Sequence, residues 1–287
     1  MDSGRIKHKI DSLLDLPGLP ATVFETVRLL GDPEVSLERV SESIELDQSM
    51  TSKILRLVNS PFYGVAGKIS TIQQALVVLG FGTVRNAMLS LSVFDVFLRD
   101  GTAKGSFDLT GFWEHAVGTG VIAKVLAQGL RLPDPDEFFI AGLLHDIGKI
   151  IIIQFLQQEF AEILQLVDDR DLYIREAETG VLGFDHSYVG SYLAKKWNMP
   201  VTLKEVIAFH HAPDAAREDP KKVSVVHLAD TLCRGLGIGH GGDTLVPAIA
   251  TEALQTLGIN IGYIAEALPE IDAEMEQAAD FMTIFSI

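Results

Sequence analysis

The sequence predicts an all-α protein, and three observations lead to that fold class. Apolar residues recur at intervals of three and four through most of the chain, which is the period of an amphipathic helix. No useful stretch alternates apolar and polar residues with a period of two, as a half-buried strand would. Capping residues, glycines and prolines divide the pattern into segments of helical length. We therefore expect a multi-helical bundle with essentially no sheet.

The first third of the chain is predicted to form a series of short helices. Their expected ranges are 6–14, 21–30, 37–46, 50–58, 71–79 and 84–98. Ser36 and Asp47 are the expected N-caps of the third and fourth helices, because their side-chain oxygens can accept hydrogen bonds from the free amides of a first turn. Gly80 is expected to end the fifth helix. The polar, glycine-rich segment 100–106 marks a junction, so residues 1–106 are assigned to an N-terminal helical part.

The remaining two thirds also show a helical pattern. The expected ranges are 110–130, 136–144, 151–168, 171–182, 186–197, 200–211, 223–232, 251–257 and 261–281. Pro269 is expected to break or kink the last helix, because proline lacks an amide hydrogen and clashes with the preceding turn. We assign residues 107–240 to a core domain and residues 241–287 to C-terminal helices that pack on it. The glycine-rich stretch 235–243, which contains His240, is expected to be an exposed and mobile loop.

Composition limits the partners that the chain can have. With 287 residues, 47% of them hydrophobic, it can form one large or two medium domains. A formal net charge of -16 opposes sequence-independent binding to nucleic acid. Cys233 is the only cysteine, which excludes a disulfide framework and favours a reducing compartment. No apolar run is long enough to span a bilayer, and no secretory signal begins the sequence. We therefore expect a cytoplasmic protein that binds neither nucleic acid nor membrane.

A histidine–aspartate pair, His145 and Asp146, ends an apolar run and is followed by Gly148 and Lys149. Adjacent side chains on a helix point about 100° apart, but they can share a ligand where the helix ends, and Gly148 suggests such an end. A neutral imidazole beside a carboxylate suits a divalent transition metal. Lys149 could hold a phosphate oxygen beside that metal. The alternative is a pair that merely caps a core helix.

Further histidines and a second aspartate lie on the predicted helices after residue 110. They are His115, His186, His210, His211 and Asp230. One histidine on an apolar helix is usually a satisfied core residue, but burying five imidazoles without partners would cost a few kcal/mol apiece. A metal centre would supply the partner. His227, three residues before Asp230, either orients that aspartate or packs as an ordinary helical residue.

The order of these residues resembles the HD superfamily of metal-dependent phosphohydrolases, which is named for its His-Asp pair. The resemblance implies two divalent metal ions that are bridged by Asp146. The first ion would also bind His115, His145 and Asp230, and the second would bind His186, His210 and His211. Lys149 matches the lysine on the phosphate side of that family's site. Asp146 and Lys149 are therefore the catalytic residues that the resemblance implies.

The N-terminal part narrows the resemblance to the HDOD family, the HD-related output domains of bacterial signalling proteins. The matching features are the Leu-Pro steps at 16–17 and 19–20, Asp47, Leu57 to Ser60 with Tyr63 and Gly64, and Ile72, Ala75, Leu79 and Gly80. The resemblance extends over residues 16–230. It implies a regulatory protein, because many HDOD members lack the metal ligands. It also implies a partner, another signalling protein, and we expect the N-terminal part to bind it.

Two functions remain open from the sequence. One is a signal-transduction protein whose metal centre is structural or senses a ligand, and the other is a metal-dependent phosphohydrolase or phosphodiesterase acting on a nucleotide or other phosphoester. Cleavage of cyclic di-GMP is disfavoured, because Ala212 and Pro213 stand where the phosphodiesterases of the HD-GYP type carry an acidic residue and a Gly-Tyr-Pro segment. Iron and manganese are the expected metals, and zinc and nickel also suit such ligands.

Overall fold

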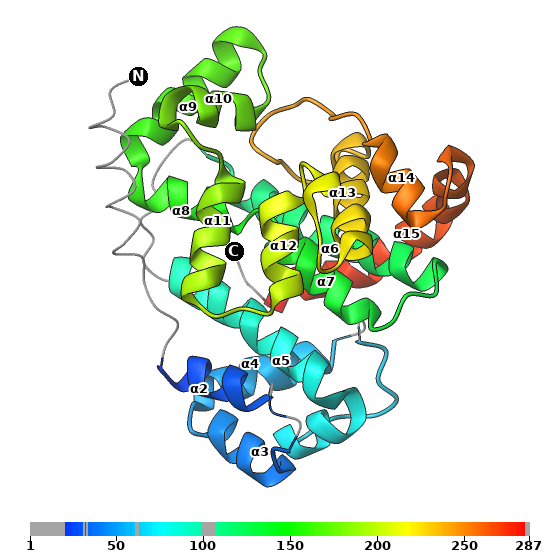
Figure 1. Ribbon diagram of the computed structural model, residues 1–287. Helices are drawn as coiled ribbons and strands as arrows, with labels where there is room; N and C mark the ends of the chain where they lie inside the picture. The colour runs from blue at the N-terminus through cyan, green and yellow to red at the C-terminus, as the bar shows by residue number, and fades with distance from the viewer. Residues whose placement is uncertain (1–20, 31, 33, 61–62, 99–106, 285–287) are drawn as a thin grey trace. The chain divides into compact units, whose positions relative to one another are not determined.

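The structure, a computed structural model, describes residues 21–30, 32, 34–60, 63–98 and 107–284 (Figure 1). Within these residues it contains fourteen α-helices, one short 3-10 helix and no strand, which confirms the all-α fold class. The chain divides into two compact units. The smaller one lies within Gly18–Arg99 and Leu268–Ile287, and the larger one within Asp100–Ala267. The domain boundaries drawn from the sequence remain predictions. The predicted helix at 6–14 and the predicted junction at 100–106 lie outside the described residues.

The smaller unit is built from the first helices of the chain. These are α2 (Ala21–Leu30), α3 (Leu37–Glu45), α4 (Gln48–Val58) and α5 (Ile72–Leu98). Helices α2, α3 and α4 each pack against α5. Both predicted caps are present, since Ser36 accepts a hydrogen bond from the Arg39 amide and Asp47 from the Met50 amide. The predicted break at Gly80 is also present inside α5, where that residue has φ 83° and ψ 164°.

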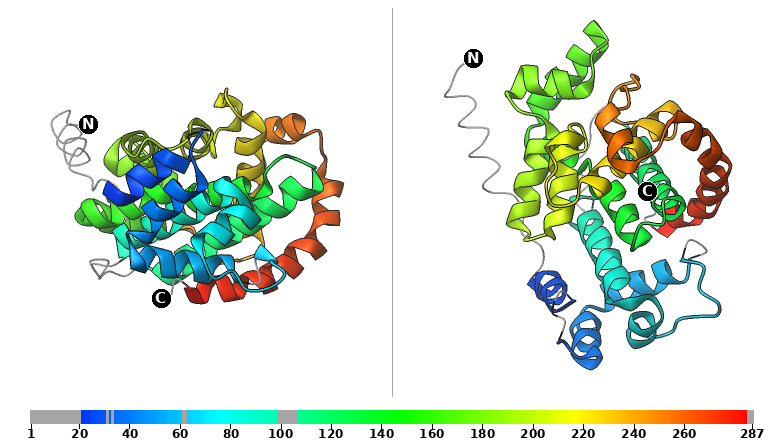
Figure 2. Two further views of the ribbon diagram at one scale, coloured as in Figure 1. Left: turned by 90° about the horizontal axis from the view of Figure 1, so that it is seen from below. Right: turned by 45° about the vertical axis from the view of Figure 1, so that its right-hand side comes forward.

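The larger unit contains the longest buried helix and the elements that surround it (Figures 1 and 2). Its helices are α6 (Leu109–Gly129), α7 (Pro135–Leu144), α8 (Ile147–Phe155), α9 (Gln157–Arg170), α10 (Ile174–Leu182), α11 (His186–Lys196), α12 (Val201–Phe209), α13 (Pro220–Gly235) and α14 (Thr251–Leu257). Helix α6 is buried from residue 115 to 127 and packs against α7 and α13. Helix α11 packs against α8 and α12. The turn between α7 and α8 is therefore surrounded by four further helices, because α6, α12 and α13 contact α7 and α11 contacts α8.

Two helix boundaries differ from the prediction. The single helix expected over 151–168 is two helices, because α8 begins at Ile147 and ends before Leu156, whose φ of -128° and ψ of 49° interrupt the helix. The run of isoleucines in α8 is buried on all sides, so its periodicity could not reveal where the helix begins. Pro269 was expected to break or kink the last helix; α15 (Ile261–Ile284) continues through it, so the helix is not broken there. An interior proline removes one backbone hydrogen bond and its ring crowds the carbonyl four residues before it, at a cost of about 3 kcal/mol, which the remaining bonds of a long helix can offset.

One stretch among the described residues, Pro135–Phe155, has the length and hydropathy of a membrane span, with a mean hydropathy of 1.7. It consists of α7, a turn and α8, and 89% of its most apolar window is buried inside the protein. A segment that the protein itself covers in this way is a core element. Its apolar character therefore reflects packing around the His-Asp turn.

Two glycines allow the His-Asp turn to approach its neighbours closely. A Cβ atom on Gly142 would lie 2.7 Å from the Gly120 Cα, so the backbones of α7 and α6 touch there. A Cβ atom on Gly148 would overlap the His186 carbonyl oxygen, so the backbones of α8 and α11 also touch. The sequence suggested that Gly148 ends a helix, but it lies in the first turn of α8 and serves this contact instead.

The contact at Gly142 gives a test of the packing. Gly142→Ala should lower the free energy of unfolding by about 1–3 kcal/mol, because the new methyl group meets backbone that cannot move aside. Gly180→Ala is the matched control, since a Cβ there would lie 3.7 Å from the Leu166 Cδ2 atom. That change should raise stability by about 0.4–1 kcal/mol through the unfolded chain. Urea denaturation measures both, and equal effects from the two substitutions would contradict the close approach.

Candidate metal centre

The His-Asp pair forms a two-residue turn between α7 and α8. Because the helix is interrupted there, both side chains point inward, and His145 Nε2 lies 3.3 Å from Asp146 Oδ2. Both residues are buried, with exposed fractions of 0% and 1%. The interruption that the sequence suggested therefore exists, two residues earlier than Gly148.

The other predicted site residues come to this turn from four helices. His115 lies in the middle of α6, His186 begins α11, His210 caps the C-terminus of α12 with His211 beside it, and Asp230 lies in α13. All seven candidate ligands are brought together, and six of them are buried. His211 is the partly exposed member. The site thus collects residues that are up to 115 positions apart in the sequence, from His115 to Asp230.

One oxygen of Asp146 faces a first cluster, formed by His115, His145 and Asp230. The Oδ2 atom lies 3.7 Å from His115 Nε2 and 3.3 Å from His145 Nε2. Asp230 completes the group, because its Oδ1 atom lies 3.2 Å from His115 Nε2 and 3.9 Å from His145 Nε2. Two imidazoles and two carboxylates therefore share one small volume.

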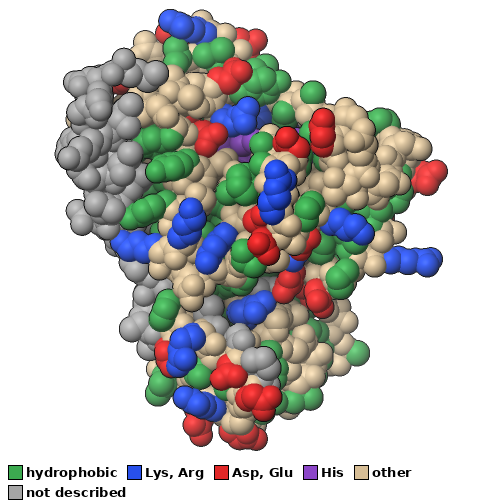
Figure 3. Space-filling view, viewed as in Figure 1, with side chains coloured by type: hydrophobic (Ala, Val, Ile, Leu, Met, Phe, Trp, Pro, Cys, Tyr) green, Lys and Arg blue, Asp and Glu red, His purple; other side chains and the backbone are tan. Residues whose placement is uncertain are grey.

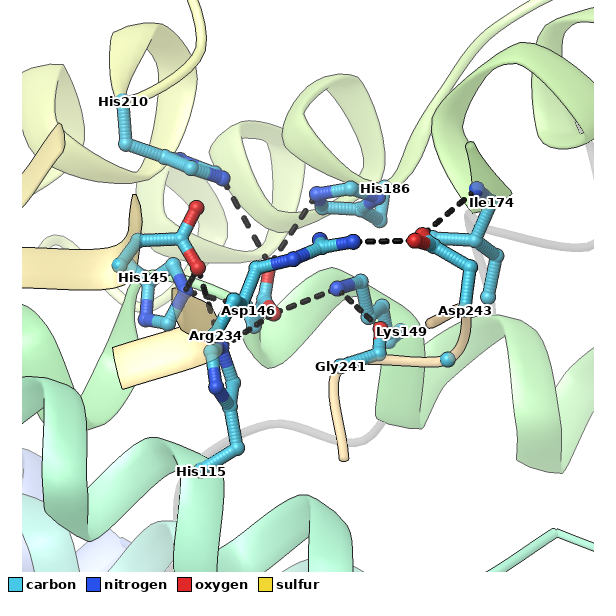
Figure 4. A network of polar contacts seen from close by, with 12 residues as sticks. His115, His145, Asp146, Lys149, Ile174, His186, His210, Arg234, Gly241 and Asp243 are labelled. Atoms are coloured by element: carbon cyan, nitrogen blue, oxygen red, sulfur yellow. Dashed lines mark hydrogen bonds and ion pairs between the residues drawn. The ribbon is translucent and has the colours of Figure 1, made fainter. Parts of the chain in front are cut away.

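The other oxygen of Asp146 faces a second cluster, formed by His186, His210 and His211. The Oδ1 atom lies 3.1 Å from His186 Nε2 and 3.5 Å from His210 Nε2 (Figure 4). His211 joins the cluster through its Nε2 atom, which lies 3.0 Å from His186 Nε2. A single carboxylate thus separates two groups of imidazoles, one on each of its oxygens.

The Nδ1 atoms of three imidazoles are bound on the side away from Asp146. His145 Nδ1 lies 2.6 Å from the Gly142 carbonyl oxygen, and His210 Nδ1 lies 3.1 Å from that of Val206. His186 Nδ1 lies 2.6 Å from Glu178 Oε2. A carbonyl or carboxylate in this position accepts the Nδ1 hydrogen, which leaves the Nε2 lone pair for a metal. The ring orientation of these residues is therefore set by their own surroundings.

The donor atoms fit a metal, because several are buried without a hydrogen-bonding partner among the described residues. These atoms are His115 Nε2, His145 Nε2, His210 Nε2, Asp146 Oδ1 and Asp230 Oδ1. Buried polar atoms are normally paired, and leaving this many unpaired at one point would be costly. Imidazole nitrogen and carboxylate oxygen together suit iron, manganese, zinc and nickel. The ligand atoms of Asp146, His186, His210 and His211 also lie within 4.8 Å of one another, as do those of His115, His145 and Asp146.

The electrostatics of the site follow from the charge of Asp146. Burial alone would raise the pKa of this carboxyl group, but His145, Lys149 and His186 outweigh burial and hold the pKa well below its usual range. Burial lowers the pKa of His186, whereas Glu178 and Asp146 raise it to about 9 overall. Burial lowers the pKa of His210 to about 4. Without an ion the carboxylate is therefore charged, His210 is neutral, and His186 carries a proton that an ion would have to displace.

Lys149 is buried beside this carboxylate and is tied to a distant segment. Its Nζ atom donates hydrogen bonds to Asp146 Oδ2 at 2.5 Å and to the Gly241 carbonyl oxygen at 2.7 Å. The segment Gly239–Asp243, called the strap below, therefore closes over Lys149. The strap was expected to be an exposed, mobile loop, and the structure instead shows Gly241, Gly242 and Asp243 buried.

Further contacts hold the strap in place. The His240 amide donates to the Gly111 carbonyl oxygen at 2.7 Å, and Asp243 Oδ2 accepts from the Ile174 amide at 2.9 Å. Asp243 Oδ1 also pairs with the Arg234 guanidinium group (Figure 4). At Gly239, with φ of 63°, a Cβ atom would lie 2.2 Å from the His115 amide nitrogen. The strap is therefore packed against the helix that carries His115.

Two residues behind the ligands have roles that sequence reasoning missed or misplaced. Glu178 is fully buried, and its Oε2 atom accepts hydrogen bonds from both the backbone amide and the Nδ1 atom of His186. The sequence does contain a signal for Glu178. This charged residue lies four positions after Ile174 and four before Leu182, on a helix face where an apolar residue is expected. His227 does not orient Asp230, because its Nδ1 atom bonds the His210 carbonyl oxygen at 2.8 Å and its Nε2 atom accepts from the Ala250 amide.

These pKa shifts predict how pH changes the stability of chelator-treated protein. The folded-state pKa of His186 lies above the unfolded value of about 6.5, so its contribution is complete below pH 6.5 and is lost as pH rises through 9. The folded-state pKa of His210 lies below the unfolded value, so stability is lost as pH falls from about 6.5 through 4. The free energy of unfolding should therefore be greatest near pH 6.5 in urea titrations.

Glu178→Gln distinguishes the loss of stability at alkaline pH, which is assigned to His186, from the loss at acid pH, which is assigned to His210. Without the carboxylate the pKa of His186 falls, so the loss of stability between pH 7 and 9 should weaken while the loss in acid remains. Glu176→Gln removes the same charge from the exposed side of α10 and should leave the profile unchanged. An alkaline decline that Glu178→Gln does not alter would show that this carboxylate has no part in holding the His186 proton.

Comparison with known proteins places this geometry in a family. The HDOD domain family matches residues 16–213. A solved HDOD domain protein of unknown function from Geobacter sulfurreducens is 28% identical with a TM-score of 0.79, and the match covers 97% of each chain. A Shewanella amazonensis structure with a provisional phosphohydrolase name is 24% identical with a TM-score of 0.75 over 99% of each chain, which shows the same fold.

Two bacterial relatives are longer than this chain. An uncharacterized protein of Treponema pallidum is 26% identical over 229 residues, which are 79% of this chain and 44% of the relative. The uncharacterized protein YuxH of Bacillus subtilis is 26% identical over 165 residues, which are 58% of this chain and 37% of the relative. The matched region therefore spans less than half of either relative. Because the family match over residues 16–213 includes more than half of the sequence, the chain belongs to the HDOD domain family.

Proposed function

We propose that this chain is a bacterial signal-transduction protein that regulates a partner and is built around two divalent metal ions. The proposal rests on one observation: the two carboxylate oxygens of Asp146 face two separate histidine clusters. One ion would bind Oδ2 with His115, His145 and Asp230, and the other would bind Oδ1 with His186, His210 and His211. Iron or manganese suits these ligands best, and zinc or nickel is compatible with them.

The same site supports a second candidate function, metal-dependent hydrolysis of a nucleotide or other phosphoester. Two ions on a bridging carboxylate activate water and neutralise phosphate charge when they are bound. Asp146 would hold both ions, and its low pKa keeps it charged. Lys149 places a fixed positive charge next to that carboxylate, where it can offset charge on a phosphoryl group. The strap holds the Lys149 ammonium group in this position.

We place the regulatory function first because of how the larger and smaller units differ. Six of the seven candidate ligands are buried, which suits a centre that stabilises or senses. The smaller unit presents large apolar side chains to solvent, with exposed fractions of 79% for Leu46, 70% for Val77 and 57% for Val78. Such side chains suit contact with another signalling protein. Phe62 and Tyr63, in the turn after α4, are further candidate contacts from the sequence; Tyr63 is partly buried, and Phe62 lies outside the described residues.

The proposed location is the cytoplasm. Cys233 is buried in α13, and burial raises the pKa of its thiol to about 12. A thiol with this pKa stays protonated and unreactive. A single buried thiol of this kind is compatible with a reducing compartment such as the cytoplasm.

Metal content tests the dinuclear proposal. The wild type, purified without chelator and incubated with iron or manganese, should hold two ions by elemental analysis. Asp146→Ala should lose both because it removes the shared ligand, and His186→Ala should retain one. Glu114→Ala is the control, since this exposed residue neighbours His115 in sequence but points to solvent. A wild type that holds at most one ion, or a His186→Ala variant with unchanged content, would refute the assignment.

Two measurements on the metal-loaded protein distinguish the candidate functions. If the regulatory function holds, bis(p-nitrophenyl) phosphate should not be hydrolysed above background, and Val77→Asp with Val78→Asp should reduce capture of a cellular partner while Asp146→Asn should not. If the enzymatic function holds, the wild type should hydrolyse the phosphodiester and Asp146→Asn should abolish turnover. Partner capture that survives the two valine substitutions would exclude their surface as the docking site.

A further inference from the structure

A groove on the larger unit leads to the second histidine cluster. It has a volume of about 560 Å³, lies along α11 and α12, and reaches His211 at one end. Figure 3 shows a histidine at the bottom of a hollow on this side of the molecule, with basic and acidic side chains at its rim. Because His211 is the partly exposed member of the candidate ligands, this groove offers a ligand a route to the centre.

The groove carries three basic side chains that are not paired. Arg175, Lys195 and Lys204 line it, and their side chains make no hydrogen bond or ion pair with any other described residue. Arg175 lies one turn before Glu178, which binds His186, so this guanidinium group is near the end that reaches the metal centre. Lys195 lies near the opposite end of α11. Free cations at both ends of a groove are notable in a chain with a net charge of -16.

Three carboxylates also line the groove, and two of them, those of Asp185 and Glu205, are bound by the protein itself, whereas that of Glu218 is exposed. Asp185 caps α11 by accepting a hydrogen bond from the Tyr188 amide at 3.2 Å. Glu205 accepts from the backbone amides of Arg217, Glu218 and Asp219 at 2.7, 2.8 and 2.9 Å. These bonds offset two of the three negative charges locally, so three basic side chains remain against the one carboxylate of Glu218.

An aromatic ring lies between the two ends. Tyr188 is 49% exposed in the groove, and its ring lies 5.5 Å from that of Phe184, centroid to centroid. Tyr188, Ser191 and Lys195 follow one another at helical spacing along the groove, and seven residues of helix separate Tyr188 from Lys195 by about 10 Å. A half-exposed ring that a neighbour supports can stack against a nucleobase.

We propose that this groove binds a nucleotide that carries phosphate groups at both ends. One phosphate lies beside His211 and Arg175, the base stacks on Tyr188, and a second phosphate binds Lys195 and Lys204. The first of these contacts rests on the proposed metal function, whereas the base and the second phosphate depend only on the groove. The groove thereby selects a nucleotide over a phosphorylated compound without an aromatic ring.

Calorimetric titration of the full-length, metal-loaded protein tests this assignment with three probes. Adenosine 3′,5′-bisphosphate should bind about tenfold or more tightly than AMP, because only the former supplies the second phosphate. Inorganic pyrophosphate is the probe without a base. Tyr188→Ala should weaken binding of both nucleotides about tenfold and leave pyrophosphate unchanged, and Tyr188→Phe should restore nucleotide binding.

Charge variants complete the experiment. Lys195→Gln with Lys204→Gln should remove the advantage of the bisphosphate over AMP, whereas Lys221→Gln, an exposed lysine on α13, should not. If the bisphosphate binds no better than AMP, or if the double variant keeps the difference, the groove assignment is overturned even when the protein holds two ions. Another outcome separates the two proposals: the protein is found to hold no metal, while the Lys195, Lys204 and Tyr188 substitutions still change nucleotide binding as stated. In that case the groove assignment is supported and the metal proposal is refuted.

Discussion

The larger unit depends on the burial of one charged carboxylate. Asp146 is 1% exposed, and a charge removed from water must be surrounded by groups that offset it. Lys149 and His186 do so at 2.5 and 3.1 Å, on opposite oxygens. This requirement explains the features around it: a helix interrupted before Asp146, the glycine that lets α8 reach α11, and a strap whose carbonyl oxygen takes a second hydrogen bond of Lys149.

Helix ends position the imidazoles around that carboxylate. The last carbonyl oxygens of a helix have no partner within the helix. In α7 and α12 those of Gly142, Val206 and Ile207 accept the Nδ1 hydrogens of His145 and His210. Glu178 does the same for His186. The ligand geometry is therefore a property of the protein itself, and an ion would enter a prepared site instead of assembling it.

The sequence was sufficient for the fold class and for the residues of the candidate site, because both leave local signals. Helical periodicity and caps such as Asp47 are readable from neighbours in sequence, and the histidines were conspicuous on apolar helices. What it missed depends on distant contacts. The isoleucines of α8 are apolar on every side, so the boundary at Leu156 left no pattern. The strap was expected to be mobile because of its glycines, although glycine is required at position 239, where a Cβ atom would lie 2.2 Å from the His115 amide nitrogen.

The position of α13 and the strap late in the chain has a practical consequence. A recombinant fragment that ended before residue 220 would retain all five clustered histidines and the His-Asp turn. It would lack Asp230, the Gly241 oxygen that Lys149 binds and the His227 ring that supports His210. Such a fragment would contain every clustered histidine. If it bound no metal, that result would follow from the missing residues and would say nothing about the full-length protein.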